Sequence, residues 1–228
     1  MSSSLQAFAS EKLARLERQS LRRELHPTRR AAGARVERDG QALISFACND
    51  YLNLATHPAV IAASVAATQR YGAGAGASRL VTGEHPLYAG LEARLAALKG
   101  TEDAAVFGSG YLANTGIIPA LVGPGDVLFV DELAHACIWA GAKLSGAAIH
   151  VFGHNDMAAL AALLAAERAR HRHAMVATDT VFSMDGDLAP IAELAELSAQ
   201  HDVWALTDDA HGLGVVPKSS AASRIPLQ

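Results

Sequence analysis

The sequence predicts an α/β protein in which helices flank a mainly parallel sheet. Half of the 228 residues are apolar and 18% are charged, so the chain can bury a sizeable core. From about residue 104, short β-like runs alternate with helical patterns, which indicates right-handed βαβ crossovers. No internal repeat or low-complexity linker interrupts this alternation, so one large domain, with or without an additional segment, is expected.

Apolar periodicity places the elements of this domain. The expected strands cover residues 104–107, 127–130, 148–152, 174–182 and 203–208. The helical patterns between them cover residues 112–122, 135–144, 156–170 and 190–200. Sheets of this kind bind ligands at the carboxyl ends of their strands. The candidate site therefore comprises the loops 107–111, 131–135, 180–185 and 208–211.

The first hundred residues follow a different pattern. An amphipathic helical period runs through the first twenty residues, and acidic residues within it argue against a transit peptide. Two alternating runs flank Asp39 and Gly40, which predicts a β-hairpin with a tight turn. Helices are expected before Gly72 and before Gly100. The predicted organisation is an N-terminal helix and hairpin segment (1–48), a large domain (49–216) and an atypical tail (217–228).

Composition argues against several classes of partner. The net charge is −4 without a basic stripe, which argues against nucleic acid or an anionic membrane as the main partner. The longest apolar run, residues 157–166, is too short to span a membrane. Cys48 and Cys137 lie far apart and form no CxxC pair. They are expected to be buried thiols in a reducing, cytoplasmic environment, and no metal site is predicted.

The stretch FGSGYLAN joins an expected strand to an expected helix. Its glycines allow a tight turn, and the amides of Gly110 and Tyr111 would face outward at the positive end of the helix. A phosphate fits such a position. A plain strand-to-helix turn that needs glycine for its geometry is an equally good interpretation.

The stretch VWALTDDAHG places Asp208 and His211 at the ligand end of the sheet. A carboxylate facing the nitrogen of a heteroaromatic ring would raise the pKa of that nitrogen and keep it protonated. An Asp/His metal pair and an acidic turn are the alternatives. A metal site would need further ligands, which no spacing supplies.

Two other loops carry candidate side chains. His135, at the start of a helix, could stack on a flat ring or contact a substrate carboxylate, or it could make only a local hydrogen bond. Ser183 lies where an expected strand ends, so its hydroxyl could reach a ligand. Asp187 follows in the turn and is expected to cap the next helix.

Taken in order, several motifs resemble the α-oxoamine synthases, which are enzymes of the aspartate aminotransferase fold that use pyridoxal 5′-phosphate (PLP). The resemblance covers residues 20–216 approximately, and its nearest match is to the member that acts in biotin synthesis. It is carried by ACNDYLNLATHP, GASRLVTGEHPLYAGLEARLAALKGTEDA, FGSGYLANTGIIPALVGPGD, LAHACIWAGAKLSGA, FSMDGDLAPIAEL and DDAHGLGV.

The resemblance implies a role for each candidate side chain. Backbone at Gly110 and Tyr111 would hold the cofactor phosphate, and His135 would stack on the ring and meet the substrate. Asp208 would pair with the pyridine nitrogen. Ser183 and His211 would contact the phenolic oxygen of the cofactor. The residues that would contact substrate are Arg22, Asn49 and Ser78.

The implied reaction is a decarboxylative condensation of an amino acid, here L-alanine, with an acyl thioester such as pimeloyl-CoA or a pimeloyl-carrier protein. The family acts as a homodimer, which is the expected assembly. Other members of the family, of the 2-amino-3-oxobutyrate CoA ligase or 5-aminolevulinate synthase type, are the nearest alternatives. They share the cofactor-binding residues and differ in using glycine.

The family places its Schiff-base lysine after the Asp-x-x-His strand. Lys218 follows His211 by seven residues, in a stretch that does not resemble the lysine motif, and Lys143 lies within a helical pattern. We therefore expect a chain truncated before that lysine, without the C-terminal small domain and inactive alone, with a foreign tail from about Pro217. A non-catalytic partner subunit that has lost its lysine is a further alternative.

Overall fold

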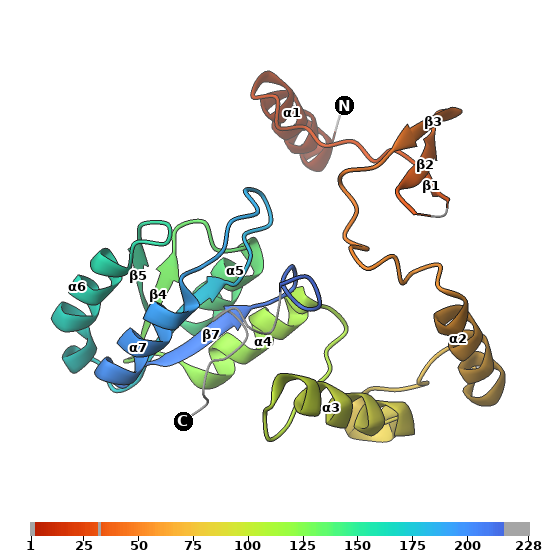
Figure 1. The fold of residues 1–228 in the computed structure, drawn as a ribbon. Coiled ribbons are helices and arrows are strands. Elements are labelled where there is room, and N and C mark those ends of the chain that lie inside the picture. The colour runs from red at the N-terminus through yellow and green to blue at the C-terminus, as the bar shows by residue number, and fades with distance from the viewer. Residues whose placement is uncertain (1–2, 32, 217–228) are drawn as a thin grey trace. The chain divides into compact units, whose positions relative to one another are not determined.

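The structure is a computed structural model that describes residues 3–31 and 33–216 (Figure 1). The chain forms two compact units, Met1–Ile61 and Ala62–Gln228. The predicted boundaries at 48/49 and 216/217 stay predictions. The tail from Pro217 lies outside the described residues.

The first unit contains one helix and a small antiparallel sheet. The helix α1 spans Ser4–Arg18, and the strands are β1 (Arg29–Arg30), β2 (Arg35–Arg38) and β3 (Gln41–Ile44), in the order β1-β2-β3. Asp39 and Gly40 join β2 to β3 with φ values of 52° and 74°. Two consecutive positive φ values are typical of a type I′ turn, so the predicted hairpin is confirmed.

Two helices precede the parallel sheet in the chain. The helix α2 (Pro58–Tyr71) contains the boundary between the units, and α3 spans Pro86–Lys99. Gly72 and Gly100 follow them with positive φ values, as expected for helix ends. Between the helices, η1 (Arg79–Gly83) forms a short π-helical turn.

The second unit is built around a four-stranded parallel sheet. Its strands are β4 (Val127–Asp131), β5 (Ala148–Phe152), β6 (Ala174–Asp179) and β7 (Trp204–Asp208), in the order β5-β4-β6-β7. The register pairs Asp179 with Asp208, so the carboxyl ends of β6 and β7 lie side by side. This confirms the α/β architecture and the mainly parallel sheet.

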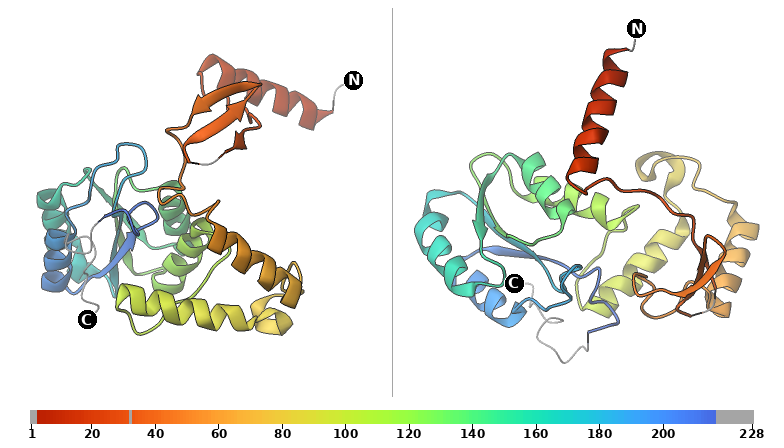
Figure 2. Two further views of the ribbon diagram at one scale, coloured as in Figure 1. Left: turned by 45° about the vertical axis from the view of Figure 1, so that its right-hand side comes forward. Right: turned by 90° about the horizontal axis from the view of Figure 1, so that it is seen from above.

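Helices cover both faces of this sheet (Figure 2). The helices α4 (Gly110–Leu121) and α5 (Ala136–Ser145) pack on one face, where Ile118 and Ile138 join a cluster with alternate residues of β4 and β6. The helices α6 (Met157–Glu167) and α7 (Ile191–His201) pack on the other face around Phe129. Neighbouring residues of a strand point to opposite faces, so each strand contributes to both cores.

Three predicted elements differ from the structure. Residues 104–107 form no strand, because the backbone of Val106 is hydrogen-bonded to the side chains of Glu92 and Arg79. The strand predicted to reach residue 182 ends at Asp179, and only Val181 forms an isolated bridge beyond it. The helix predicted to reach residue 170 continues after α6 as a 3-10 turn, η2 (Arg168–Arg170).

The strand β7 lies at one edge of the sheet. Among the described residues it pairs only with β6, and none of its residues is fully buried; Trp204 is 42% exposed. The opposite edge is β5. No helix in the described part of the chain is long and apolar enough to cross a membrane.

Candidate functional site

Asp208 is the last residue of β7, and its carboxylate is held in place on both oxygens. Oδ2 accepts a 2.7 Å hydrogen bond from Nδ2 of Asn114, and Oδ1 accepts a 3.0 Å hydrogen bond from the amide of Ala210. The side chain is half-buried at the carboxyl end of the sheet. An oriented carboxylate with a partly open side is suited to meet a cationic or protonated group of a ligand.

The N-terminus of α4 lies one helical turn before Asn114. The hydroxyl of Ser109 accepts from the amide of Leu112 at 3.1 Å, whereas the amides of Gly110 and Tyr111 have no acceptor among the described residues. No atom lies within 4 Å of the position that a Cβ of Gly110 would take. These amides lie at the positive end of the helix dipole, about 6 Å along the helix from Asn114, and such a position favours negative charge.

His135 caps the N-terminus of α5. Its Nδ1 accepts from the amide of Cys137 at 3.3 Å, and its own amide donates to Oδ2 of Asp179 at 2.8 Å. The local hydrogen bond anticipated for this histidine is therefore present. Because Nδ1 accepts, the proton of the neutral ring lies on Nε2, which has no partner among the described residues. The ring is exposed and can still contact a ligand.

Cys137 connects His135, Asn114 and Asp208. Its buried Sγ lies 2.8 Å from Nδ1 of His135, 3.1 Å from Nδ2 of Asn114 and 3.8 Å from Oδ2 of Asp208. Burial raises the pKa of this thiol, and the charge of Asp208 raises it further. The thiol is therefore neutral and has a packing role. The prediction of a buried thiol is confirmed for Cys137, while the free Cys48 is half-buried.

Asp179 is a second acidic residue at this end of the sheet. Asp179 is 3% exposed, and burial raises the pKa of its carboxyl group to about 6. The neighbouring charge of Asp208 acts in the same direction, while the hydrogen bond from the amide of His135 opposes it. Asp179 was not among the residues predicted from the sequence, because its place opposite Asp208 depends on the register of β6 and β7.

The chain beyond β7 is fixed by its neighbours. The carbonyl of Asp208 accepts from the amide of Thr180 at 2.8 Å, and Oγ1 of Thr180 donates to Oδ1 of Asp209 at 2.6 Å. Lys99 pairs with the other oxygen of Asp209, so this lysine is engaged in an ion pair. Lys143 is exposed in the last turn of α5, far from the N-terminus of that helix.

The loop that carries Ser183 is attached to the end of β4. The ring of His154 bridges Oδ1 of Asp131 at 3.1 Å and Oδ2 of Asp187 at 2.7 Å. Burial lowers the pKa of His154, but its bonds to these two carboxylates outweigh that effect and raise it. The expectation that Asp187 caps the next helix is wrong, because its carboxylate binds His154 and Asn155.

The predicted site residues fall into both units. Ser183 is exposed in the turn after β6, and the half-buried His211 follows β7 in the next turn. Ser78 precedes η1, and its carbonyl accepts from the amides of Val81 and Gly83. Arg22 and Asn49 belong to the first unit, where Arg22 pairs with acidic neighbours and Asn49 is exposed.

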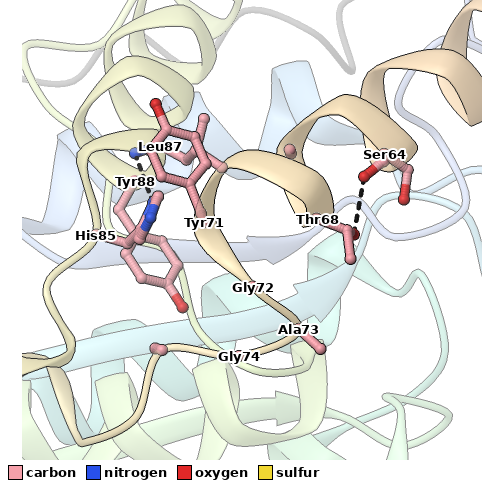
Figure 3. Close-up of a pocket in the computed structure, with 11 residues that line it drawn as sticks. Ser64, Thr68, Tyr71, Gly72, Ala73, Gly74, His85, Leu87 and Tyr88 are labelled. Carbon is pink, nitrogen blue, oxygen red and sulfur yellow. Dashed lines mark hydrogen bonds between the residues drawn. The ribbon is translucent and has the colours of Figure 1, made fainter.

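A pocket of about 300 Å³ lies between α2 and α3 (Figure 3). The rings of Tyr71 and His85 meet edge to face at 4.4 Å on its wall, and Gly72 and Gly74 form part of its border. Part of the glycine-rich stretch before Ser78, residues 72–75, lines this pocket.

Comparison with known proteins gives consistent results. A relative from Acidiphilium cryptum (strain JF-5), provisionally named 8-amino-7-oxononanoate synthase, is 68% identical over 227 residues, which cover 98% of this chain and 60% of the relative. The 8-amino-7-oxononanoate synthase of Maricaulis maris (strain MCS10) is 63% identical over 94% of this chain and 55% of its own length. The chain thus spans 60% or less of these relatives.

A serine palmitoyltransferase from S. paucimobilis, solved with a bound PLP–myriocin aldimine, has a TM-score of 0.81 and 27% identity, covering 90% of this chain and 54% of that one. The resemblance drawn from the motifs is therefore confirmed. Residues 41–228 match the family described as aminotransferase class I and II. The chain belongs to this family of PLP-dependent enzymes.

Proposed function

We propose that this chain is the cofactor-binding part of an 8-amino-7-oxononanoate synthase. The reaction would condense L-alanine with a pimeloyl thioester, carried by CoA or by a carrier protein, with release of CO₂. Support comes from relatives of that name at 63–68% identity, provisional in one case, and from a site whose side chains fit PLP. Biotin synthesis in the cytoplasm is the setting that this activity implies.

The oriented carboxylate of Asp208 is the observation that carries the proposal. PLP, when bound, supplies an aromatic ring that withdraws electrons from the amino-acid α-carbon once its ring nitrogen is protonated. Asp208 would hold that proton by ion pairing, since an adjacent carboxylate raises the pKa of a ring nitrogen. Asn114 and the amide of Ala210 keep the carboxylate in one orientation for this task.

The other contacts follow from the positions of neighbouring loops. The amides of Gly110 and Tyr111 would bind the phosphate, because no described residue accepts from them and they lie at a positive helix end. The exposed ring of His135 would stack on the cofactor. Ser183 and His211 would donate hydrogen bonds to the phenolic oxygen, by analogy with the family.

His135 is also the candidate for orienting the substrate. With Nδ1 held by the amide of Cys137, Nε2 can donate to a substrate carboxylate. Arg22, Asn49 and Ser78 would contribute further substrate contacts, as in the family. We propose a homodimer as the assembly in which these contacts are completed.

Titration of the purified chain with PLP tests the cofactor site. Asp208→Asn preserves shape and removes the charge, so we expect at least a tenfold loss of PLP affinity. Asp185→Asn is the matched control, because Asp185 is exposed and the change in net charge is the same. Equal affinities of the two variants would show that Asp208 does not face the cofactor.

Two further measurements address the reaction. After incubation with PLP, borohydride reduction and peptide mapping should give no pyridoxyl-lysine in this chain. A modified Lys218 would contradict the expectation that this chain lacks the Schiff-base lysine. The whole protein, assayed with pimeloyl-CoA, should consume L-alanine rather than glycine. Preference for glycine would instead favour the 2-amino-3-oxobutyrate CoA ligase or 5-aminolevulinate synthase type.

A further inference from the structure

We propose that His150, Glu167 and His171 form a binding site for a divalent transition-metal ion such as Zn²⁺. One ligand atom from each of these residues lies within 4.8 Å of the other two, and all three residues are half-buried. His150 belongs to β5, which is the edge of the sheet opposite to β7 and Asp208. Three inter-strand spacings, roughly 14 Å, separate these two strands.

The fold brings the three residues together through the packing of α6 on the sheet. His150 points to the same face as Phe152, which packs against Leu160 and Leu164 of α6. Glu167 is the last residue of α6, and the 3-10 turn η2 then returns the chain to His171, shortly before β6.

Packing also orients one of the ligands. The imidazole of His150 stacks on the ring of Phe129, with 5.8 Å between the ring centroids and 29° between their planes. Phe129 is fully buried in the core beneath α6. A fixed imidazole lowers the entropic cost of assembling a metal site.

Two imidazoles and one carboxylate form a ligand set typical of zinc sites that keep a fourth position for water. In tetrahedral coordination with bonds of about 2.0–2.2 Å, ligand atoms lie roughly 3.3–3.6 Å apart. Small rotations of the half-buried side chains would close the remaining distance. Nitrogen ligands favour Zn²⁺, Co²⁺ or Ni²⁺ over Mg²⁺ and Ca²⁺, which prefer oxygen.

Arg170 competes with a metal for Glu167. Its Nη1 lies 2.8 Å from Oε1 of Glu167, and its side chain is 69% exposed, so it can move into solvent. The other nearby arginines are already engaged, Arg168 with Asp202 and Arg172 with Asp126. A metal ion on this carboxylate would lie beside one exposed guanidinium group, whose positive charge opposes metal binding.

The predicted effect of the metal is to cross-link parts of the fold. It would link the end of α6 and the residue after η2 to β5 by coordinate bonds. Asp208 lies at the opposite edge of the sheet. A ligand that binds only the folded chain stabilises it in proportion to the logarithm of its concentration. Zn²⁺ should therefore raise the melting temperature of the chain without PLP.

Titration of the metal-free chain with CoCl₂ tests the site, because Co²⁺ bound to nitrogen ligands absorbs visible light. We expect one ion per chain, competition by ZnCl₂ and none by MgCl₂. His150→Gln and His171→Gln should each weaken binding at least tenfold, and Glu167→Gln should also weaken it. His173→Gln is the matched control, since His173 is close in sequence but stacks on Trp204 instead.

Arg170→Ala provides a test in the opposite direction. Removing the competing guanidinium should tighten Co²⁺ binding at least twofold, and circular dichroism should confirm that each variant is folded. Absence of saturable 1:1 binding, or wild-type affinity in both histidine variants, would overturn the proposal. If a histidine variant is unfolded, Glu167→Gln and Arg170→Ala test the proposal instead. The proposal requires the first to weaken Co²⁺ binding and the second to tighten it. None of these measurements uses PLP, so a negative result leaves the proposed function untouched.

Discussion

The side-chain amide of Asn114 donates a 2.7 Å hydrogen bond to Oδ2 of Asp208, a residue 94 positions later in the chain. The same amide lies 3.1 Å from the sulfur of Cys137. One side chain thus joins α4, α5 and β7 at the carboxylate on which the proposed cofactor site depends.

Substitution of Asn114 should weaken PLP binding in a defined order. Asn114→Ala removes one donor from Asp208, and we expect about a tenfold loss of affinity, since hydrogen bonds to charged groups contribute about 1.5–3 kcal/mol. Asn114→Asp places a second negative charge beside Asp208 and should cause a larger loss. Fluorescence titration with PLP measures both. Thr115→Ala should bind like the wild type, because among the described residues Thr115 bonds only to carbonyls of its own helix. A larger loss in Asn114→Ala than in Asn114→Asp would contradict this role of Asn114.

Gly141 permits the close approach of α5 to α4. A Cβ at this position would lie 2.5 Å from the carbonyl oxygen of Asn114 and 2.9 Å from Cδ1 of Ile118. Gly141→Ala should therefore separate the helices and lower the free energy of unfolding by about 1–3 kcal/mol, as overpacking does. Urea denaturation provides the measurement. Gly90→Ala is the control, since nothing lies within 4 Å there and alanine should stabilise α3 slightly.

The stability of the fold should depend on the protonation of Asp179. Its pKa is about 6 in the folded chain and 3.8 in the reference state, so the folded chain binds the proton more tightly. The associated stabilisation is fully present below pH 3.8 and is lost as the pH rises through 6. The difference between these pKa values corresponds to a contribution of at most about 3 kcal/mol to the free energy of unfolding.

Urea denaturation of the wild type and of Asp179→Asn, at several pH values between 4 and 7, measures this contribution. The free energy of unfolding of the wild type relative to the variant should fall with rising pH over this range. A constant or rising difference would show that Asp179 does not hold its proton more tightly in the folded chain.

His154 should stabilise the turn that carries Ser183. His154→Gln removes the bridge between Asp131 and Asp187, so amide hydrogens in residues 182–188 should exchange faster in mass spectrometry. Because the pKa of His154 is raised, its stabilisation is present at low pH and lost as the pH rises through its folded value. The exchange of α7 should change little, and His201→Gln serves as the control; faster exchange throughout the unit would indicate general destabilisation instead.

Local patterns predicted much of the fold. The Asp39-Gly40 turn follows from two residues that tolerate positive φ, and the order of strands and helices follows from apolar periodicity. Residues 104–107 had the right composition for a strand, but their backbone bonds to Glu92 and Arg79 depend on the tertiary fold. Periodicity contains no information on such side-chain partners.

The sequence pointed to candidate site residues only at the loops that follow apolar runs. Asp208 and the Gly110 turn were predicted because apolar runs that end in polar residues, and glycine-containing turns, are visible in the sequence. Asn114 and Cys137 lie inside helices, and their contact with Asp208 depends on the packing of α4 against α5. The carboxylate of Asp187 could not be assigned to His154 because 33 residues separate them.

The position of β7 has a practical consequence for work with this chain. Its outward-facing amides and carbonyls have no strand beside them among the described residues, and such a row is a template for the backbone of another molecule. Aggregation by strand addition is therefore expected at the strand that ends in Asp208. Dilute samples, or a lysine introduced on the solvent side of that strand, should keep the isolated chain dispersed long enough to measure its ligands.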